Sequence, residues 1–156
     1  MGDRQAHLME AWRMLAPHCL QRRLSSIYET QPMYVEDQPV FLNAVGMAAV
    51  SLEPRELLDL IHDIERKLGR NRAREQRMGP RTIDIDILLF DSLVVETPDL
   101  SIPHPRITER GFVLVPLLEL SPDLHDPRTG VAYRDSLRGL GGAKPGVLGV
   151  YSPPSE

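Results

Sequence analysis

The sequence predicts an α+β domain in which helices and strands interleave and pack in layers. Its length of 156 residues is that of one domain. Hydrophobic residues make up 42% and charged residues 26%, as in an ordinary globular protein, while an aromatic content of 5% leaves the core to aliphatic side chains. Helical and strand patterns alternate along the chain without a glycine-rich phosphate loop or an internal repeat, which favours the α+β class.

Four segments have the pattern of helices. Residues 2–15 carry apolar side chains at helical spacing. Pro54 begins a second helix, since proline is tolerated in a first turn, and Gly69 is a suitable residue to end it. Residues 112–120 have the apolar density of a helix, and residues 135–140 fit a short one.

Strand candidates lie between these helices. The segment 82–90 has the clearest strand pattern, and Val94-Val95 is expected to continue as its partner strand. Residues 24–30 and 41–52 are further strand candidates, and the polar, proline-containing stretch 31–39 between them is expected to be a loop.

Beyond the last helix candidate the composition changes. A turn is expected at residues 126–130, which read Asp-Pro-Arg-Thr-Gly. The last 16 residues hold four glycines and three prolines, so we expect a single domain over residues 1–140 and a flexible tail over 141–156.

Charge and cysteine content narrow the function classes. The net charge of -4 argues against a generic nucleic-acid binder. The single cysteine, Cys19, has no internal disulfide partner, which favours a reducing compartment. The sequence shows no signal peptide and no stretch of about 20 apolar residues, so we expect a cytoplasmic protein without a membrane span.

Two acidic residues alternate with isoleucines in the segment 82–90. In a strand, Asp84 and Asp86 share one face, with their Cβ atoms about 6–7 Å apart, two strand rises. Two neighbouring carboxylates repel each other, and a divalent cation relieves the repulsion. Oxygen ligation by one or two carboxylates and substrate phosphates is typical of Mg²⁺. The alternative is a solvated strand face with two surface aspartates.

The stretch that leads into this segment is strongly basic. Between residues 66 and 81 seven basic residues stand against one acid, Glu75: Arg66, Lys67, Arg70, Arg72, Arg74, Arg77 and Arg81. Six of the seven are arginines, whose planar forks match phosphate oxygens. An arginine-rich loop next to paired carboxylates indicates a polyphosphate site. An RNA-binding or solvated loop is the alternative, weakened by the lack of interleaved aromatic residues.

A histidine in a proline-flanked loop is a third candidate. Pro103 and Pro105 hold His104 in an extended loop close to Arg106 and Arg110. Such a histidine can donate a hydrogen bond to a phosphate, and a surface histidine without a role is the alternative. The other histidines have no metal-ligand spacing, so zinc is not expected.

These motifs together resemble those of the 6-hydroxymethyl-7,8-dihydropterin pyrophosphokinase family of the folate pathway. The similarity covers about residues 2–140 and rests on several separate motifs in the same order, which makes it more specific than one short pattern. The matching stretches are Gly2-Asp3-Arg4, Tyr28-Glu29-Thr30, 37–44 (Asp-Gln-Pro-Val-Phe-Leu-Asn-Ala), 79–88 (Gly-Pro-Arg-Thr-Ile-Asp-Ile-Asp-Ile-Leu), Pro103-His104-Pro105-Arg106 and Arg110-Gly111-Phe112.

The resemblance implies a ferredoxin-like antiparallel sheet with helices packed on it. It implies transfer of the β,γ-diphosphate of ATP to the pterin hydroxymethyl group, with AMP as the other product. Two Mg²⁺ ions would be held by Asp84 and Asp86. The implied catalytic residues are Arg70, Arg72, Arg81, Asp84 and Asp86. The implied ATP-binding residues are Glu65, Arg72, Arg81, Ile87, His104 and Arg110.

The resemblance also implies a pterin site. Its residues would be Thr30, Met33, Phe41, Asn43 and Phe112. The two phenylalanines would stack on the flat heterocycle, and the Asn43 amide would offer both a donor and an acceptor to its edge. Without the resemblance, both phenylalanines read as core residues.

The sequence departs from the family pattern in three places. Met78 stands where many members have tryptophan. The loop 69–79 is about one residue longer than in some members, which leaves open whether Arg70, Arg72 or Arg74 is the catalytic arginine. The family's apolar first strand, which is central in its sheet, is not found. Either Met1 is a misassigned start or the apolar stretch 146–151 takes that place.

These departures leave two alternatives to an active enzyme. One is a truncated, catalytically weak domain that still binds nucleotide or pterin. The other is a basic-loop RNA-binding module. For the enzyme we expect ATP and the pterin as partners, with no nucleic acid and no membrane. We expect a monomer, with an oligomer left open.

Overall fold

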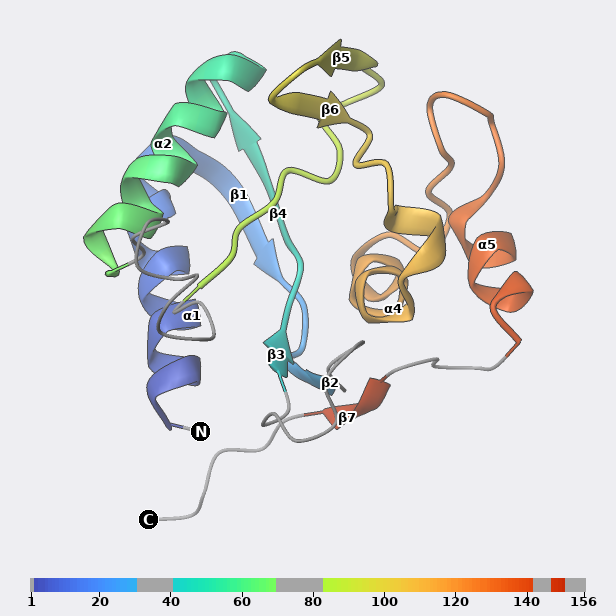
Figure 1. Cartoon of the computed structure of the whole chain (residues 1–156), viewed down its shortest axis with the longest axis horizontal. Coiled ribbons are helices and arrows are strands. Elements are labelled where there is room, and N and C mark those ends of the chain that lie inside the picture. Colours follow the sequence, from blue (N-terminus) through green and yellow to red (C-terminus); the bar gives the residue numbers. More distant parts are fainter. Residues whose placement is uncertain (1, 31–40, 70–82, 142–146, 151–156) are drawn as a thin grey trace. The chain divides into compact units, whose positions relative to one another are not determined.

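A computed structural model describes residues 2–30, 41–69, 83–141 and 147–150 of the chain (Figure 1). Helices and antiparallel sheets are both present, which confirms the predicted α+β class. The contacts within the chain divide it into unit 1, residues 1–22 and 48–87, and unit 2, residues 23–47 and 88–156. Within the described ranges, no helix has the length and apolar character that crossing a membrane requires.

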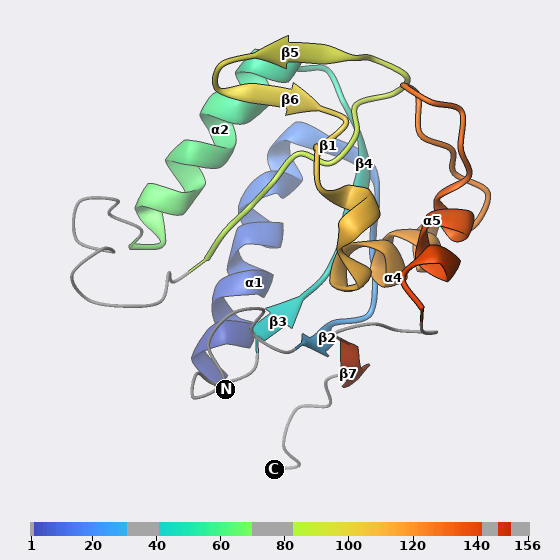
Figure 2. The same ribbon diagram turned by 45° about the vertical axis from the view of Figure 1, so that its right-hand side comes forward.

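Two helices dominate unit 1. Helix α1 (Gly2–Leu15) is followed by the 3₁₀ turn η1 (Ala16–His18), and helix α2 (Pro54–Lys67) contacts α1 (Figure 2). Both helices were predicted from their apolar spacing. The N-terminus of α2 has proline in its first turn, and the Glu53 N–H donates to the Glu56 carboxylate over 2.9 Å. Gly69 follows the helix with φ of +96°, a left-handed conformation that favours glycine.

A two-stranded sheet joins β1 (Cys19–Leu24) and β4 (Gly46–Val50). The Arg22 guanidinium lies 4.1 Å from the centre of the Trp12 ring and also donates to the Trp12 carbonyl, so β1 is fastened to α1 by one side chain.

The two expected strands 24–30 and 41–52 are each interrupted. The first contributes the end of β1 and then β2 (Tyr28–Thr30), and the second contributes β3 (Phe41–Asn43) and β4. The breaks meet at Ser25 and Val45. The Ser25 N–H donates to the Val45 carbonyl and the Val45 N–H donates to the Ser25 hydroxyl, both over 2.9 Å. The Ser25 hydroxyl therefore accepts a hydrogen bond that a backbone carbonyl would accept in a continuous β-ladder.

Unit 2 contains a three-stranded antiparallel sheet in the order β3-β2-β7. In register, Thr30 stands opposite Phe41 on one side and opposite Val147 on the other. Strand β7 (Val147–Val150) lies in the stretch that we expected to be a flexible tail, and the structure differs there. This short, mostly apolar strand pairs with β2 although glycine and proline are frequent around it. This stretch is also the one considered as a substitute for the family's first strand.

The expected pairing of Val94-Val95 with the segment 82–90 is wrong. Strand β5 (Val95–Thr97) pairs instead with β6 (Leu100–Ile102), with Val95 opposite Ile102. A two-residue turn connects them, so a local hairpin satisfies the backbone of β5 without a distant partner.

The segment with the clearest strand pattern is not a strand. Thr82 lies outside the described residues, and residues 83–90 carry no strand assignment. Their burial still alternates, with Asp84 and Asp86 exposed, Ile83 and Ile85 partly covered and Ile87 buried. The predicted alternation between aspartates and isoleucines is therefore present, and the predicted strand is not found in residues 83–90.

The core of unit 2 forms around two helices. Helix α4 (Gly111–Leu120) follows the 3₁₀ turn η2 (Ile107–Glu109), and helix α5 (Tyr133–Gly139) packs against α4. Both helices confirm the sequence prediction. The turn expected at 126–130 is also present, closed by the Gly130 N–H donating to the Asp126 carbonyl over 2.7 Å. The buried cluster consists of Val45, Ile107, Leu114, Leu117, Leu120 and Tyr133.

Candidate functional site

The candidate site in unit 1 consists of two exposed carboxylates and one buried carboxylate. Asp84 and Asp86 face solvent on either side of Ile85. The Ile85 N–H donates to Glu65 Oε2 over 2.9 Å. Glu65 lies near the end of α2 and is only 3% exposed, next in sequence to the buried Ile64. The backbone between the two aspartates is therefore tied to a helix through a buried carboxylate.

This donor set fits one kind of metal site. Carboxylate oxygens are ligands that Mg²⁺ prefers, and Mg²⁺ is usually held by one or two carboxylates together with substrate phosphates. In the part of the chain that the structure describes, no group of three or more His, Cys, Asp or Glu side chains could hold a metal ion alone. Asp84 and Asp86 fit a Mg²⁺ that takes phosphate and water as its further ligands.

In unit 2, the expected pterin residues of the sheet lie on neighbouring strands. The Asn43 amide nitrogen on β3 donates to the Thr30 hydroxyl on β2, and Thr30 is 1% exposed. This bond orients the amide. Its nitrogen is engaged with Thr30, so the amide oxygen is the atom that can accept from another group. Phe41, opposite Thr30 in register, is 39% exposed. A fixed amide and an exposed ring on one short strand are suited to binding a flat polar heterocycle.

A second aromatic ring lies in the first turn of helix α4. Phe112 is half-buried in the first turn, and the Arg110 guanidinium lies 5.5 Å from the centre of its ring. Arg110 is also the N-cap residue of α4, and its carbonyl accepts from the N–H groups of Val113 and Leu114 over 3.0 Å. Its backbone and side chain are thus both held at the helix start, where the dipole favours anions.

His104 is held in its loop by two backbone bonds. Its N–H donates to the Leu88 carbonyl over 2.8 Å, and its Nδ1 accepts from the Arg106 N–H over 3.2 Å. Because Nδ1 is an acceptor here, the neutral ring carries its proton on Nε2. A donor at Nε2 is the form of histidine that suits a phosphate oxygen.

Several expected site residues lie outside the described residues, and their placement stays a prediction. They are Met33, Arg70, Arg72 and Arg81, together with Arg74 and Met78, which the sequence analysis also singled out.

A polar cluster that no sequence pattern predicted joins α4 to β2. The Tyr28 hydroxyl donates to Glu119 Oε1 over 2.5 Å, and the Ser26 N–H and hydroxyl donate to Glu119 Oε2 over 2.8 and 3.2 Å. Burial, and then the bond to Glu119, raise the pKa of Tyr28 to about 12. Burial works against the charge on Glu119, but its hydrogen bonds from Tyr28 and Ser26 outweigh this and lower its pKa.

This cluster ties the helix whose first turn contains Phe112 to the strand that carries Thr30. No sequence signal marks it, because Glu119 lies more than 90 residues from Ser26 and Tyr28.

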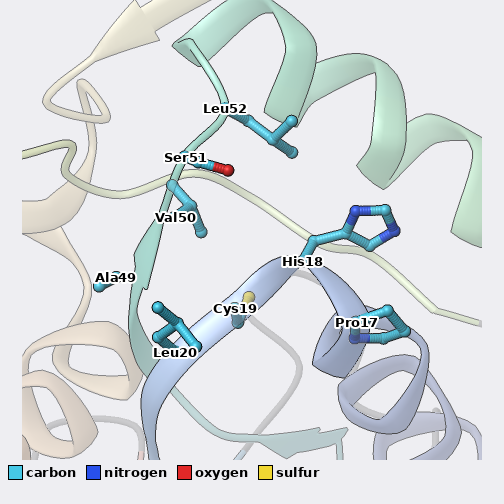
Figure 3. A pocket seen from close by; sticks show the side chains of 8 residues that line it. All are labelled: Pro17, His18, Cys19, Leu20, Ala49, Val50, Ser51 and Leu52. Atoms are coloured by element: carbon cyan, nitrogen blue, oxygen red, sulfur yellow. The ribbon is translucent and has the colours of Figure 1, made fainter.

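A pocket of about 310 Å³ in unit 1 holds none of the expected site residues (Figure 3). Its walls are residues 17–20 and 49–52, most of them apolar. It contains neither a carboxylate nor an arginine or lysine, so it lacks the groups that a magnesium–polyphosphate site needs.

Comparison with known proteins gives a consistent result. The family model described as 7,8-dihydro-6-hydroxymethylpterin-pyrophosphokinase (HPPK) matches residues 1–122. The 2-amino-4-hydroxy-6-hydroxymethyldihydropteridine pyrophosphokinase of Bacillus subtilis is 47% identical over 131 residues, which cover 83% of this chain and 77% of that protein. The chain belongs to the 7,8-dihydro-6-hydroxymethylpterin-pyrophosphokinase family.

Longer relatives contain a similar stretch. The folate synthesis bifunctional protein of Arabidopsis thaliana is 40% identical over 140 residues, covering 88% of this chain and 28% of that protein. The folic acid synthesis protein fol1 of Pneumocystis carinii is 46% identical over 110 residues, covering 70% of this chain and 15% of that protein. The chain therefore spans less than a third of these two relatives.

Proposed function

We propose that this chain is a Mg²⁺-dependent 2-amino-4-hydroxy-6-hydroxymethyldihydropteridine diphosphokinase of folate biosynthesis. It transfers diphosphate from ATP to 6-hydroxymethyl-7,8-dihydropterin and releases AMP. Family membership supports the reaction. The observation that carries it is the pair of exposed carboxylates, Asp84 and Asp86, with the backbone between them tied to a buried glutamate. The proposal concerns this one reaction and not the further activities of the longer relatives.

Asp84 and Asp86 would hold Mg²⁺, with two ions proposed, and the metal would neutralise the charge of the triphosphate. His104 would donate from Nε2 to a phosphate oxygen, and Arg110 would add a positive charge to the same anion. We assign Arg70, Arg72 and Arg81 the role of neutralising charge that develops on the transferred group, and Ile87 a place beside the nucleotide. Most of the rate then comes from positioning and electrostatics.

In the chemical step, the hydroxymethyl oxygen of the pterin forms a bond to the β-phosphorus. The bond from that phosphorus to the oxygen bridging the α- and β-phosphates breaks, and AMP leaves with the electron pair. The hydroxyl proton is lost to solvent or to a phosphate oxygen. Holding the two substrates in line can supply on the order of 7–11 kcal/mol of the barrier reduction.

The pterin would be held by residues of two stretches, 30–43 and 110–112. Phe41 and Phe112 would stack on the ring, and offset stacks contribute about 0.5–1.5 kcal/mol beyond their buried area. The Asn43 amide oxygen would accept from an N–H of the pterin edge, because the amide nitrogen is engaged with Thr30. Met33 would complete the site, and Thr30 would orient Asn43.

The family also suggests a fold and a setting for this reaction. We propose a ferredoxin-like domain over residues 1–140, which the antiparallel sheets and packed helices support. The single cysteine is consistent with a reducing compartment, and we propose the cytoplasm. We propose a monomer that binds ATP and the pterin and no nucleic acid.

The test is an assay for AMP. Purified protein is incubated with ATP, Mg²⁺ and the hydroxymethyl pterin, and AMP and ADP are separated by chromatography. We expect AMP only when both the pterin and Mg²⁺ are present. Binding of an ATP analogue without AMP release would instead identify a domain that binds its ligands and does not turn them over.

A further inference from the structure

We propose that Glu65 is a positioning residue, whose buried carboxylate holds Asp84 and Asp86 in place through the N–H of Ile85. This inference rests on the proposed function, because it assigns Glu65 a task for the magnesium carboxylates. It differs from the role implied by resemblance, which places Glu65 on the nucleotide.

The burial of Glu65 is the first argument. The residue is 3% exposed on a helix whose Ile61 and Ile64 are also buried. Burying a carboxylate is costly unless it accepts hydrogen bonds. The Ile85 N–H supplies one over 2.9 Å, a bond strengthened by the negative charge of its acceptor. Because a backbone N–H can only donate, the Glu65 oxygen is the acceptor.

The second argument is the backbone around Ile85. In a paired strand, the Ile85 N–H would donate to a carbonyl of a neighbouring strand. Residues 83–90 are not in a strand, and the Glu65 oxygen takes the position of that acceptor. The bond therefore anchors the middle residue of the tripeptide 84–86, and no β-ladder among the described residues holds this tripeptide.

The third argument is the charge of the neighbours. Asp84 and Asp86 are both exposed and repel each other when both are ionised. A metal that uses both carboxylates needs them held at a set separation. A bond at Ile85 does this, because it fixes the one residue between them. Groups that orient metal ligands in this way typically change metal affinity about 10–100-fold when they are removed.

The two roles for Glu65 make different predictions. If the side chain contacts the nucleotide, its loss weakens nucleotide binding with or without metal. If it positions the aspartates, its loss weakens only the part of binding that depends on Mg²⁺, and it also releases the Ile85 amide.

The experiment uses the full chain with Glu65→Leu, which removes the acceptor, and Glu65→Gln, which keeps a neutral oxygen. Asp59→Asn is the matched control, because Asp59 is exposed on the same helix and the change removes the same charge. Calorimetry measures the affinity for a non-hydrolysable ATP analogue with Mg²⁺ and with a chelator. NMR measures the chemical shift and the hydrogen exchange of the Ile85 amide without ligand.

For Glu65→Leu we expect the Mg²⁺-dependent affinity to fall about 10–100-fold and the Ile85 amide to exchange faster, with unchanged binding in chelator. For Glu65→Gln we expect an upfield shift of the Ile85 amide proton, because a neutral acceptor bonds more weakly. The Mg²⁺-dependent affinity for the ATP analogue should fall about threefold for the same reason. Asp59→Asn should match the wild type in each measurement.

Equal losses with and without Mg²⁺ would overturn the proposal in favour of nucleotide contact. An unchanged Ile85 amide and unchanged affinity in Glu65→Gln would also overturn it, and this holds even if Glu65→Leu does not fold. Failure of the proposed function looks different. In that case the wild type itself either binds no magnesium–nucleotide or binds it without releasing AMP.

Discussion

At the scale of single residues, the two exposed aspartates give the most direct test of the metal assignment. We expect Asp84→Asn and Asp86→Asn each to reduce turnover by orders of magnitude, because an amide carries no charge for Mg²⁺. Both side chains are exposed, so the free energy of unfolding should change by only about 0.5 kcal/mol. Steady-state AMP release and urea denaturation measure the two quantities. Full turnover in both variants would refute the assignment.

The Tyr28–Glu119 bond gives a second prediction. Tyr28→Phe removes the donor from a tyrosine that is 6% exposed, and it leaves Glu119 with its two bonds from Ser26. A hydrogen bond to a charged group is worth about 1.5–3 kcal/mol. We expect a loss of that order in the free energy of unfolding at pH 7, measured by urea denaturation. A variant as stable as the wild type would show that the bond contributes nothing.

The same pair predicts a dependence on pH. The folded-state pKa of Glu119 is below its ordinary value of 4.5, so its interactions stabilise the fold above pH 4.5 and are lost as the pH falls through the folded value. The pKa of Tyr28 is raised from 10.0 to about 12, so its contribution is complete below pH 10 and is lost as the pH rises through 12. The difference in unfolding free energy between wild type and Tyr28→Phe should therefore narrow at both extremes. A difference that stays constant from pH 3 to pH 11 would contradict this.

Contacts between distant residues could not be predicted from the sequence, whereas local burial patterns could. The alternation of Ile and Asp predicted correctly that the aspartates differ from the isoleucines in their surroundings, since Asp84 and Asp86 are exposed and Ile87 is buried. The same pattern could not reveal that Ile85 binds Glu65, because these residues are 20 positions apart and their contact depends on packing. For the same reason the link between Tyr28 and Glu119 had no sequence signal.

At the scale of elements, helices were predictable and strand partners were not. Helix α2 follows from its own apolar spacing, with Pro54 at its start and Gly69 just beyond its end, so every signal lies within the helix or directly beside it. Strand β5 carries no information in its own sequence about whether it pairs with residues 83–90 or with β6. The short turn before β6 decides that pairing, because closing a short loop costs less conformational entropy than closing a long one.

Strand β7 gives the element-scale prediction. It forms one of the two edges that flank β2, with three residue pairs in register. Such pairs contribute roughly 0.2–1 kcal/mol each, so a chain ending at Gly146 should lose about 1–2 kcal/mol of stability. Its melting temperature should fall by about 2–8 °C.

Differential scanning calorimetry measures this change. A chain that ends at Val150 is the matched control, since it keeps β7 and loses only the residues after it. Equal melting temperatures for the two shortened chains would show that β7 does not support the sheet.

At the scale of the whole molecule, charge distinguishes the enzyme from an RNA-binding module. The net charge is -4 and aromatic residues make up 5%, which offers neither a general attraction to phosphate backbones nor a stacking platform. At about 0.15 M salt we expect no binding of a fluorescently labelled single-stranded RNA in an anisotropy titration up to about 10 μM protein. Saturable binding in that range, together with absent AMP release, would favour the RNA-binding alternative.

Ligand-linked stability is the last whole-molecule property that the proposed function predicts. A ligand that binds only the folded state at 100 times its Kd adds about 2.7 kcal/mol of stability, which is roughly 5–10 °C in melting temperature for a chain of this size. At the same concentration a non-hydrolysable ATP analogue should produce this shift with Mg²⁺ and a smaller shift with a chelator, because the triphosphate meets Asp84 and Asp86 as like charges when no metal lies between them. Mg²⁺ alone should change the melting temperature little, since two carboxylates leave most of the coordination of the ion to water. The same shift in chelator would mean that the nucleotide binds without these aspartates.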